Sequence, residues 1–139
     1  MRKYEEVRQI LLNLYHNKKM IQDKKKAIYN RYLNDIRYLA YQGIAEAQFD
    51  LAGHYEDIGF WGMPNPYYNP KKCFYWYSKA VSNNHPEAHN NLASLYEEGR
   101  GCNIDLEKAL ELYELAALLG SPSGKKNFKI MKKQMRANV

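Results

Sequence analysis

The stretch AHNNLASLYEEGRGCNIDLEKALELYELAALLG, residues 88–120, has the pattern of two short amphipathic helices joined by a glycine turn. Apolar residues recur at three- and four-residue spacings in each half, which places them on one face of a helix. They are Ala88, Leu92, Leu95 and Tyr96 in the first half, and Ala109, Leu112, Tyr113 and Ala116 in the second. Gly99 and Gly101 are expected to end the first helix, because glycine readily adopts the left-handed conformation of a C-terminal cap. Asp105 suits the N-cap of the second helix.

A helical hairpin of this size cannot bury its apolar faces alone, and the same pattern recurs on both sides of it. Upstream, Ala47, Leu51, Ala52 and Tyr55 repeat the spacing of Ala88, Leu92, Ala93 and Tyr96 with a shift of 41 residues. The second-helix pattern recurs from Asn69 to Ala80 with a shift of 36. The difference between the two shifts indicates an insertion within residues 59–68. The repeats therefore predict a stack of similar helix pairs.

These residues resemble the Sel-one-like repeat family, a relative of the tetratricopeptide repeat. The family pattern is matched at Ala88, Leu92, Tyr96, Gly99, Gly101, Asp105, Lys108, Ala109, Leu112, Tyr113, Ala116, Ala117 and Gly120. The sequence departs from the pattern at Ala93, where the family usually has glycine, at Cys102, where it has valine, and at Cys73, where it has alanine. The resemblance implies an all-α fold, a short α/α solenoid used mainly to hold other proteins. It implies no reaction.

We expect a single domain over residues 1–139, built from about seven antiparallel helices. Its predicted parts are a capping helix pair (1–42), a first repeat (43–83), a second repeat (84–120) and a C-terminal capping helix (121–139). The first repeat is expected to begin with a helix over 43–58. End repeats of a solenoid need a polar outer face, which fits the many charged residues in both terminal segments.

Charge is distributed unevenly along the chain, whose net charge is +6. Residues 1–42 hold ten Lys/Arg and four Asp/Glu, and residues 125–139 hold six Lys/Arg and no acidic residue. Residues 43–124 hold five Lys/Arg and eleven Asp/Glu, a net charge of −6. Basic ends can bind nucleic acid or an anionic surface, and this function is the alternative to protein binding. Solvated capping helices explain the same pattern, and we favour that interpretation.

Two further properties concern location and redox chemistry. No apolar run approaches the roughly 18–20 residues that span a bilayer, and the charged N-terminus lacks the apolar segment of a signal peptide. We therefore expect a cytoplasmic protein without a membrane span. Cys73 and Cys102 occupy small apolar positions of the repeat, which predicts buried thiols in preference to a disulfide.

Little in the sequence indicates a reactive site. His85 and His89 lie four residues apart at a predicted helix start, a spacing that can bind a metal, but no HExxH motif accompanies them. We expect His85 at the helix entry, His89 on the exposed surface, and His54, which aligns with Leu95, in a partly buried packing position. No glycine-rich loop matches a phosphate-binding motif. The sequence predicts no catalytic residue, no cofactor site and no metal site, and hence no enzyme.

The predicted loop at residues 59–68 is unusually apolar. It contains two glycines, two prolines and four aromatic residues, Phe60, Trp61, Tyr67 and Tyr68. Exposed aromatic residues on a loop are typical binding anchors. The favoured alternative is that these rings fold back over the helix ends as a small satellite core.

The resemblance implies that the first helix of each pair lines the concave side of the solenoid. The positions beside the buried stripe of these helices are Glu6, Gln9 and Asn13, then Glu46, Phe49 and Gly53, then Glu87, Asn90 and Ser94. Amide side chains can pair with a peptide backbone, and carboxylates favour a basic segment in the partner. Gly53 would let a ligand backbone approach the helix closely. We therefore predict a groove that binds another protein or a peptide, and the simpler alternative is a solvated surface.

Overall fold

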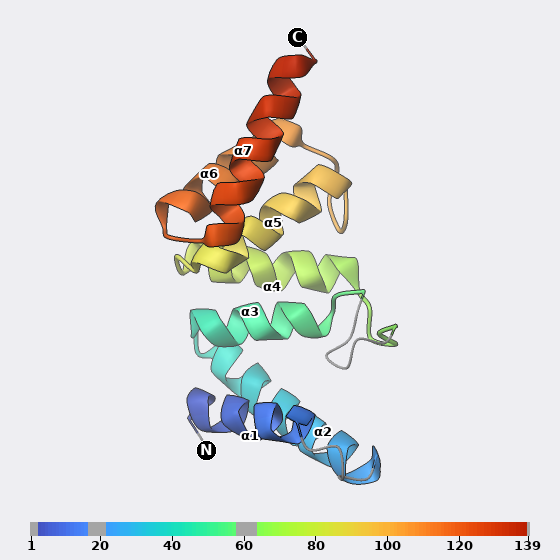
Figure 1. The fold of residues 1–139 in the computed structure, drawn as a ribbon. Coiled ribbons are helices and arrows are strands. Elements are labelled where there is room, and N and C mark those ends of the chain that lie inside the picture. The colour runs from blue at the N-terminus through green and yellow to red at the C-terminus, as the bar shows by residue number, and fades with distance from the viewer. Residues whose placement is uncertain (1–2, 17–21, 58–63, 139) are drawn as a thin grey trace.

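The computed structural model describes residues 3–16, 22–57 and 64–138. These residues form seven helices, which are α1 (Tyr4–His16), α2 (Gln22–Tyr41), α3 (Ala45–His54), α4 (Pro70–Ser82), α5 (Pro86–Glu98), α6 (Leu106–Leu118) and α7 (Pro122–Ala137). The helices stack in chain order, with α1 and α2 at one end of the stack and α7 at the other (Figure 1). The fold is the all-α solenoid that the repeats predict.

The first helices of successive pairs, α1, α3, α5 and α7, lie next to one another in one layer. Side-chain hydrogen bonds join each neighbouring pair in this layer: Tyr4 to Asp50 between α1 and α3, His85 to Glu46 between α3 and α5, and Asn127 to Asn90 between α5 and α7. We call the surface formed by these four helices the first-helix face.

The helix ends follow the local signals in the sequence. Asn69 and Asp105 each accept a hydrogen bond from the backbone N–H three residues later, at 3.1 and 3.0 Å. Helix α5 ends at Glu98 and is capped by Gly99, whose φ of 71° is left-handed. Gly101 is also left-handed, and a Cβ there would overlap the carbonyl oxygen of Pro70. The glycine turn of the second repeat therefore packs closely against the start of α4.

One apolar core runs through the stack, but the prediction for one of its tyrosines is partly wrong. Tyr113 is buried as expected, and its hydroxyl donates a hydrogen bond to Glu97 at 2.8 Å. Tyr96 is only partly buried, and its ring packs edge-on against Phe74 with the ring centroids 5.4 Å apart. Its neighbour Leu95 is buried in the core. Tyr96 therefore lies at the edge of the core, because α4 covers one side of its ring.

Helix α3 is shorter than the predicted helix over residues 43–58. It begins at Ala45 and ends at His54, where the backbone turns at Tyr55. The side-chain amide of Asn65 donates hydrogen bonds to the carbonyl oxygens of His54 and Glu56, at 2.6 and 2.7 Å. These bonds satisfy carbonyl groups that a helix end leaves without an intrahelical partner.

Predictions for one histidine and one cysteine also need correction. His89 is buried, not exposed, because α5 packs against α4, α6 and α7. Its Nδ1 atom lies 2.7 Å from the carbonyl oxygen of His85. Cys73 is buried as predicted, and burial raises the pKa of its thiol. Cys102 is only half-buried, and both thiols are free.

Candidate binding surface

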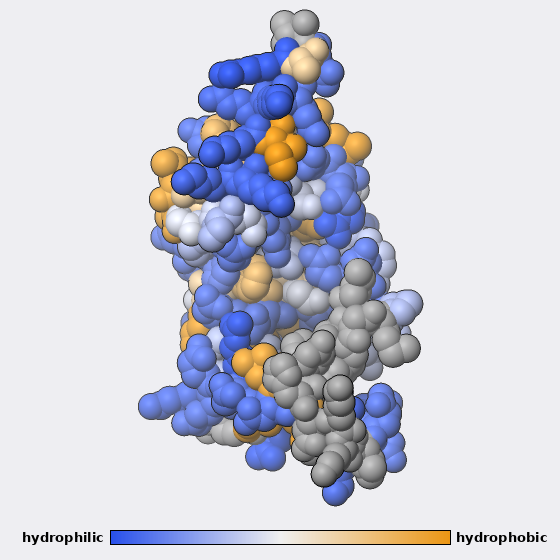
Figure 2. Space-filling view, in the orientation of Figure 1, coloured by the Kyte–Doolittle hydropathy of each residue, from blue (hydrophilic) through white to orange (hydrophobic). Residues whose placement is uncertain are grey.

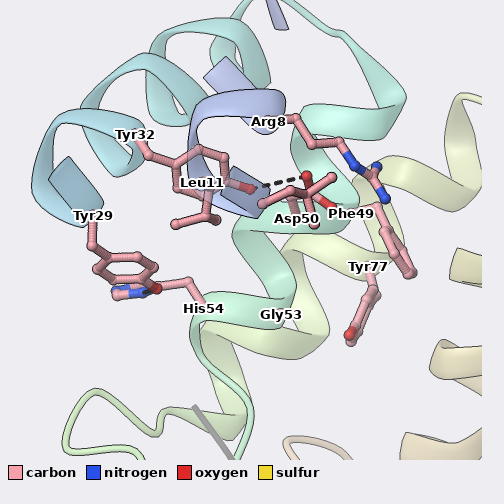
Figure 3. A pocket seen from close by; sticks show the side chains of 10 residues that line it. Arg8, Leu11, Tyr29, Tyr32, Phe49, Asp50, Gly53, His54 and Tyr77 are labelled. Atoms are coloured by element: carbon pink, nitrogen blue, oxygen red, sulfur yellow. Dashed lines mark hydrogen bonds between the residues drawn. The ribbon is translucent and has the colours of Figure 1, made fainter. Parts of the chain in front are cut away.

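A pocket of about 270 Å³ lies among α1, α2, α3 and α4. We call it the α1–α3 pocket, and its lining residues are Arg8, Leu11, Leu12, Tyr29, Tyr32, Phe49, Asp50, Gly53, His54 and Tyr77. In Figure 3, Phe49 and Tyr77 stand on one side of the pocket, and Tyr29 lies beside His54 on the other. The structure thus brings Phe49 and Gly53, two residues of the predicted groove, into one cavity.

Asp50 places a carboxylate in the wall of the α1–α3 pocket. Its Oδ2 atom accepts hydrogen bonds from the hydroxyls of Tyr4 and Tyr32, the latter at 3.0 Å. Burial raises the pKa of Asp50, while the two hydroxyl donors and nearby Arg8 oppose that rise. A buried carboxylate is costly unless donors solvate it. The tyrosines of α1 and α2 supply these donors, so the residues that hold Asp50 also join three helices.

Arg8 and Glu46 form a second charged group beside the α1–α3 pocket. The Nη1 atom of Arg8 donates to the hydroxyl of Tyr4 at 3.1 Å and lies 3.6 Å from Oε2 of Glu46. The other carboxylate oxygen of Glu46 lies 2.8 Å from Nε2 of His85. Water reaches both the Arg8 and Glu46 side chains, so this ion pair contributes little to stability. It does leave Glu46 with two partners inside the protein.

His54 forms one end of the α1–α3 pocket and remains neutral near pH 7. Its Nδ1 atom lies 2.8 Å from the hydroxyl of Tyr29, and the two rings are 5.9 Å apart. Tyr67 of the loop covers the same imidazole with a centroid distance of 5.0 Å. Burial, followed by the charges of Arg37 and Lys72, lowers the pKa of His54 to about 4. The partly buried packing role predicted for His54 is therefore close to the observed one, and the ring is more fully buried than expected.

Phe49 and Gly53 determine the shape of the α1–α3 pocket on the α3 side. The Phe49 ring stacks on His85, with centroids 4.5 Å apart and an interplanar angle of 14°, and it tilts against Tyr77 at 5.6 Å. This stacking fixes the orientation of the Phe49 ring, which forms one side of the pocket. A Cβ built at Gly53 would meet no atom within 4 Å. The absent side chain of Gly53 therefore contributes directly to the free space of the pocket.

The other predicted groove residues are distributed along the first-helix face. Ser94 donates to Glu98 at 2.9 Å, Glu87 is half-buried, and Gln9 donates to Asn13 at 3.0 Å. Glu6 is exposed on α1. None of these side chains lines the α1–α3 pocket.

Asn90 differs from the rest because α7 covers it. The side chain is buried, and its Oδ1 atom accepts a hydrogen bond from Nδ2 of Asn127 at 2.8 Å. It also donates to Asn91 at 3.1 Å. The predicted pairing of Asn90 with a peptide backbone therefore conflicts with the structure, in which the C-terminal helix takes that position.

The aromatic loop is described in part. Tyr67 and Tyr68 are exposed, although Tyr67 also contacts His54. Phe60 and Trp61 lie outside the described residues, so the choice between a binding loop and a satellite core stays a prediction. The contact between Tyr67 and His54 places one of the four aromatic residues next to the α1–α3 pocket.

Several lining residues of the α1–α3 pocket were absent from the sequence-based prediction. Arg8, Tyr29, Tyr32, Asp50 and Tyr77 come from four different helices. A weak signal exists for Asp50, because an acidic residue there directly follows Phe49 at the edge of the apolar stripe. Its tyrosine partners are 46 and 18 residues away along the chain, and helical periodicity does not indicate contacts over such separations.

Among the described residues there is neither a group of side chains placed to bind a metal nor a helix able to span a membrane. In residues 3–16, 22–57 and 64–138, no three His, Cys, Asp or Glu side chains are placed to hold a metal ion. His85 and His89 each bond to other groups, namely Glu46 and the His85 carbonyl. No helix in the same part of the chain has the length and hydropathy needed to cross a bilayer.

Comparison with known proteins identifies the repeat and relates the fold to solved structures. The sequence matches the Sel1 repeat family over residues 45–85 and 86–121. The crystal structure of a Sel1 repeat protein from Oxalobacter formigenes is similar, with 28% sequence identity and a TM-score of 0.65 over 91% of this chain and 84% of that chain. No curated protein matches the sequence.

A second solved structure shares the fold. It is a protective antigen present in uropathogenic Escherichia coli strains that displays an SLR fold, with 23% identity, a TM-score of 0.65, and coverage of 91% of this chain and 28% of that chain. This chain therefore spans less than a third of that protein.

The matched segments coincide with the helix pairs of the structure. Residues 45–85 contain α3 and α4, and residues 86–121 contain α5 and α6. Together they make up more than half of the chain. Their N-caps and buried alanines, together with the glycine turn of the second repeat, are the features that the resemblance rests on. With two such repeats in the sequence and the corresponding helix pairs in the fold, the chain belongs to the Sel1 repeat family.

Proposed function

We propose that the chain is a non-catalytic scaffold that binds a partner protein or peptide on its first-helix face, at the end formed by α1 and α3. Sel1 repeat proteins are generally protein-interaction scaffolds. The observation that supports this position is the α1–α3 pocket, whose lining comes mainly from these two helices. Pockets with apolar walls and a few polar groups are typical binding sites.

The opposite end of the first-helix face is less suited to a partner. Helix α7 lies against α5 there, and Asn127 hydrogen-bonds to Asn90. The groove residues of the second repeat are therefore partly covered by the protein itself. This difference restricts the proposed site to the α1–α3 end.

We propose that the partner presents a basic segment to this surface. Residues 43–124 carry a net charge of −6, which attracts cations to this part of the surface. Glu46 contributes less to the attraction of a basic segment than its exposure indicates, because Arg8 and His85 already approach its carboxylate. The preference therefore depends on the summed charge of the repeats.

Binding of nucleic acid or an anionic surface by the basic ends is the outcome that would replace this proposal. Figure 2 shows a mostly hydrophilic surface over α7, interrupted by apolar patches. Six Lys/Arg lie within residues 125–139. Lysines and arginines of this kind also occur on solvated capping helices, and affinity for phosphate would show itself by a steep dependence on salt.

Position-specific photo-crosslinking tests the proposed face. A photoreactive amino acid is placed at Gln9 or Glu87 on the first-helix face, and at Tyr75 or Glu111 on the second helices as matched controls. Each variant is irradiated in extract of the native cell, and the crosslinked proteins are identified by mass spectrometry.

The proposal predicts a specific protein adduct from Gln9, a weaker one from Glu87, and none from Tyr75 or Glu111. Adducts from the second-helix positions alone would overturn it. Recovery of nucleic acid in place of protein, lost on raising the salt concentration, would establish the alternative function.

A further inference from the structure

The size of the α1–α3 pocket limits its occupant. Its volume of about 270 Å³ is just below the roughly 300–1,000 Å³ of small-molecule sites. Such a space suits one bulky side chain better than a complete cofactor. The Cα hydrogen of Gly53 in its lining allows that side chain to approach the α3 backbone.

The charges of the α1–α3 pocket are paired within the protein. Asp50 accepts from two tyrosine hydroxyls, and Arg8 approaches both Tyr4 and Glu46. A cationic ligand would meet Arg8, and an anionic ligand would meet Asp50. Burial of a charge without a dedicated partner is unfavourable. Charge complementarity therefore favours an uncharged occupant.

The walls of the α1–α3 pocket favour an aromatic occupant among uncharged ones. The rings of Tyr29, Tyr32, Phe49 and Tyr77 line it, with Leu11 and Leu12 on the α1 side. Aromatic rings pair well in edge-to-face or offset geometry at centroid distances of about 4.5–7 Å. Several such pairs within the protein already have this spacing, including Phe49 with Tyr77 and Tyr29 with His54.

We infer that the α1–α3 pocket receives one uncharged aromatic side chain from a peptide segment of the partner. This inference rests on the proposed function for the origin of the side chain, since a partner on the first-helix face would present it. Leu11, Phe49 and Tyr77 contact the inserted ring, and Gly53 leaves the room for it. The acidic repeats select the basic residues that flank it in the partner.

The test measures the pocket directly with capped amino acids. Full-length ¹⁵N-labelled protein is titrated with N-acetyl-tryptophanamide, and the amide signals of Gly53, His54 and Leu12 are followed by NMR. N-acetyl-lysinamide, N-acetyl-glutamate amide and N-acetyl-alaninamide serve as charged and small controls. We expect saturable shifts with the tryptophan compound, and at least tenfold weaker binding of the other three.

Two matched pairs of variants locate the binding. Gly53→Leu fills the pocket, whereas Ser94→Leu puts the same side chain at the equivalent position of the second repeat. Leu12→Gln changes a lining residue that is 38% exposed, whereas Ile10→Gln changes a residue of the same helix that is 37% exposed and lies outside the lining. We expect Gly53→Leu to weaken tryptophanamide binding at least tenfold and Leu12→Gln about threefold, with less than a twofold change in either control.

The outcomes separate the inference from the proposed function. Tighter binding of the lysine or glutamate compound, or equal losses in a variant and its control, would overturn the inference. If Gly53→Leu does not fold, the pair Leu12→Gln and Ile10→Gln decides the same question. Crosslinking from Gln9 without any tryptophanamide binding would leave the proposed face in place and exclude the aromatic occupant. If tryptophanamide binds but crosslinks form only from the second helices, the pocket accepts an aromatic group and the proposed face is wrong.

Discussion

The two ends of the first-helix face have the same repeat architecture but different surfaces. At the α1–α3 end, Phe49 and Gly53 line an open pocket. At the α5–α7 end, the equivalent positions after a shift of 41 are Asn90 and Ser94, and Asn90 is covered by Asn127 of α7. The comparison indicates that the repeat specifies the helix pair, whereas the side chains between first helices decide whether a binding site remains.

The two ends of the first-helix face also differ in how neighbouring helices contact each other. Helix α7 packs directly on α5 and α6. Helix α1 reaches α3 through side chains, namely Tyr4 on Asp50 and Arg8 beside Glu46. A contact made through long side chains leaves space beneath them, which is where the α1–α3 pocket lies.

The largest expected effect tests the closed end. Met131 of α7 is 4% exposed, and Met131→Ala should lower the free energy of unfolding by about 2–5 kcal/mol, as other large-to-small core changes do. The adjacent Ile130 is 45% exposed, so Ile130→Ala should cost no more than about 0.5 kcal/mol. Urea unfolding followed by circular dichroism measures both. Equal losses would contradict the packing of α7 against the repeats.

The next effect tests the polar support of the open end. Asp50→Leu leaves the hydroxyls of Tyr4 and Tyr32 without their acceptor, which should cost about 1–3 kcal/mol. Asp50→Asn keeps an acceptor oxygen and removes a carboxylate whose pKa burial raises. Its cost should stay below about 1 kcal/mol. A larger loss for the asparagine variant than for the leucine variant would refute the role assigned to the two tyrosines.

A smaller effect should appear as a pH dependence that comes from the open end. Burial lowers the folded-state pKa of His54 to about 4, whereas the unfolded value is about 6.5. The unfolded chain therefore binds the proton more tightly between these values. The stability that neutral His54 contributes is complete above pH 6.5 and is lost as the pH falls toward 4. At pH 5.5 the stability already lost amounts to about 1 kcal/mol.

The control for this prediction comes from the second repeat, which has Leu95 at the equivalent position. His54→Leu should reduce the fall in unfolding free energy between pH 7 and pH 5.5, measured by urea titration at each pH. An unchanged pH profile would mean that another group causes the dependence.

The smallest expected effect concerns the glycine itself. A Cβ at Gly53 meets no atom within 4 Å, so Gly53→Ala should stabilise the protein by about 0.5 kcal/mol through the lower flexibility of the unfolded chain. Ser94→Ala removes a hydrogen bond to Glu98 and should change stability by less than about 0.5 kcal/mol. Differential scanning calorimetry can resolve the two. A destabilised Gly53→Ala variant would show that the α1–α3 pocket does not have the space described for it.

The sequence alone determined the helix pairs and their order, and it determined the helix ends wherever a cap or a glycine turn marks them, although not the end of α3. Helical periodicity depends on residues three or four apart, so the faces carrying Leu92 and Leu112 follow from local spacing. The caps at Asn69 and Asp105 and the turn at Gly99 are equally local, and each appears in the structure as predicted. The family resemblance rests on the same short-range features.

Tertiary structure decided which parts of those faces are covered. Asp50 meets Tyr4 across 46 residues, and Asn90 meets Asn127 across 37. Helical spacing indicates that a position is near the edge of an apolar stripe, but it does not indicate which neighbouring helix covers that position. For this reason His89 and Asn90 are buried where exposure was predicted, and eight of the ten lining residues of the α1–α3 pocket were not among the predicted binding residues. The site depends on contacts among four helices, and these contacts exist only once the helices have packed.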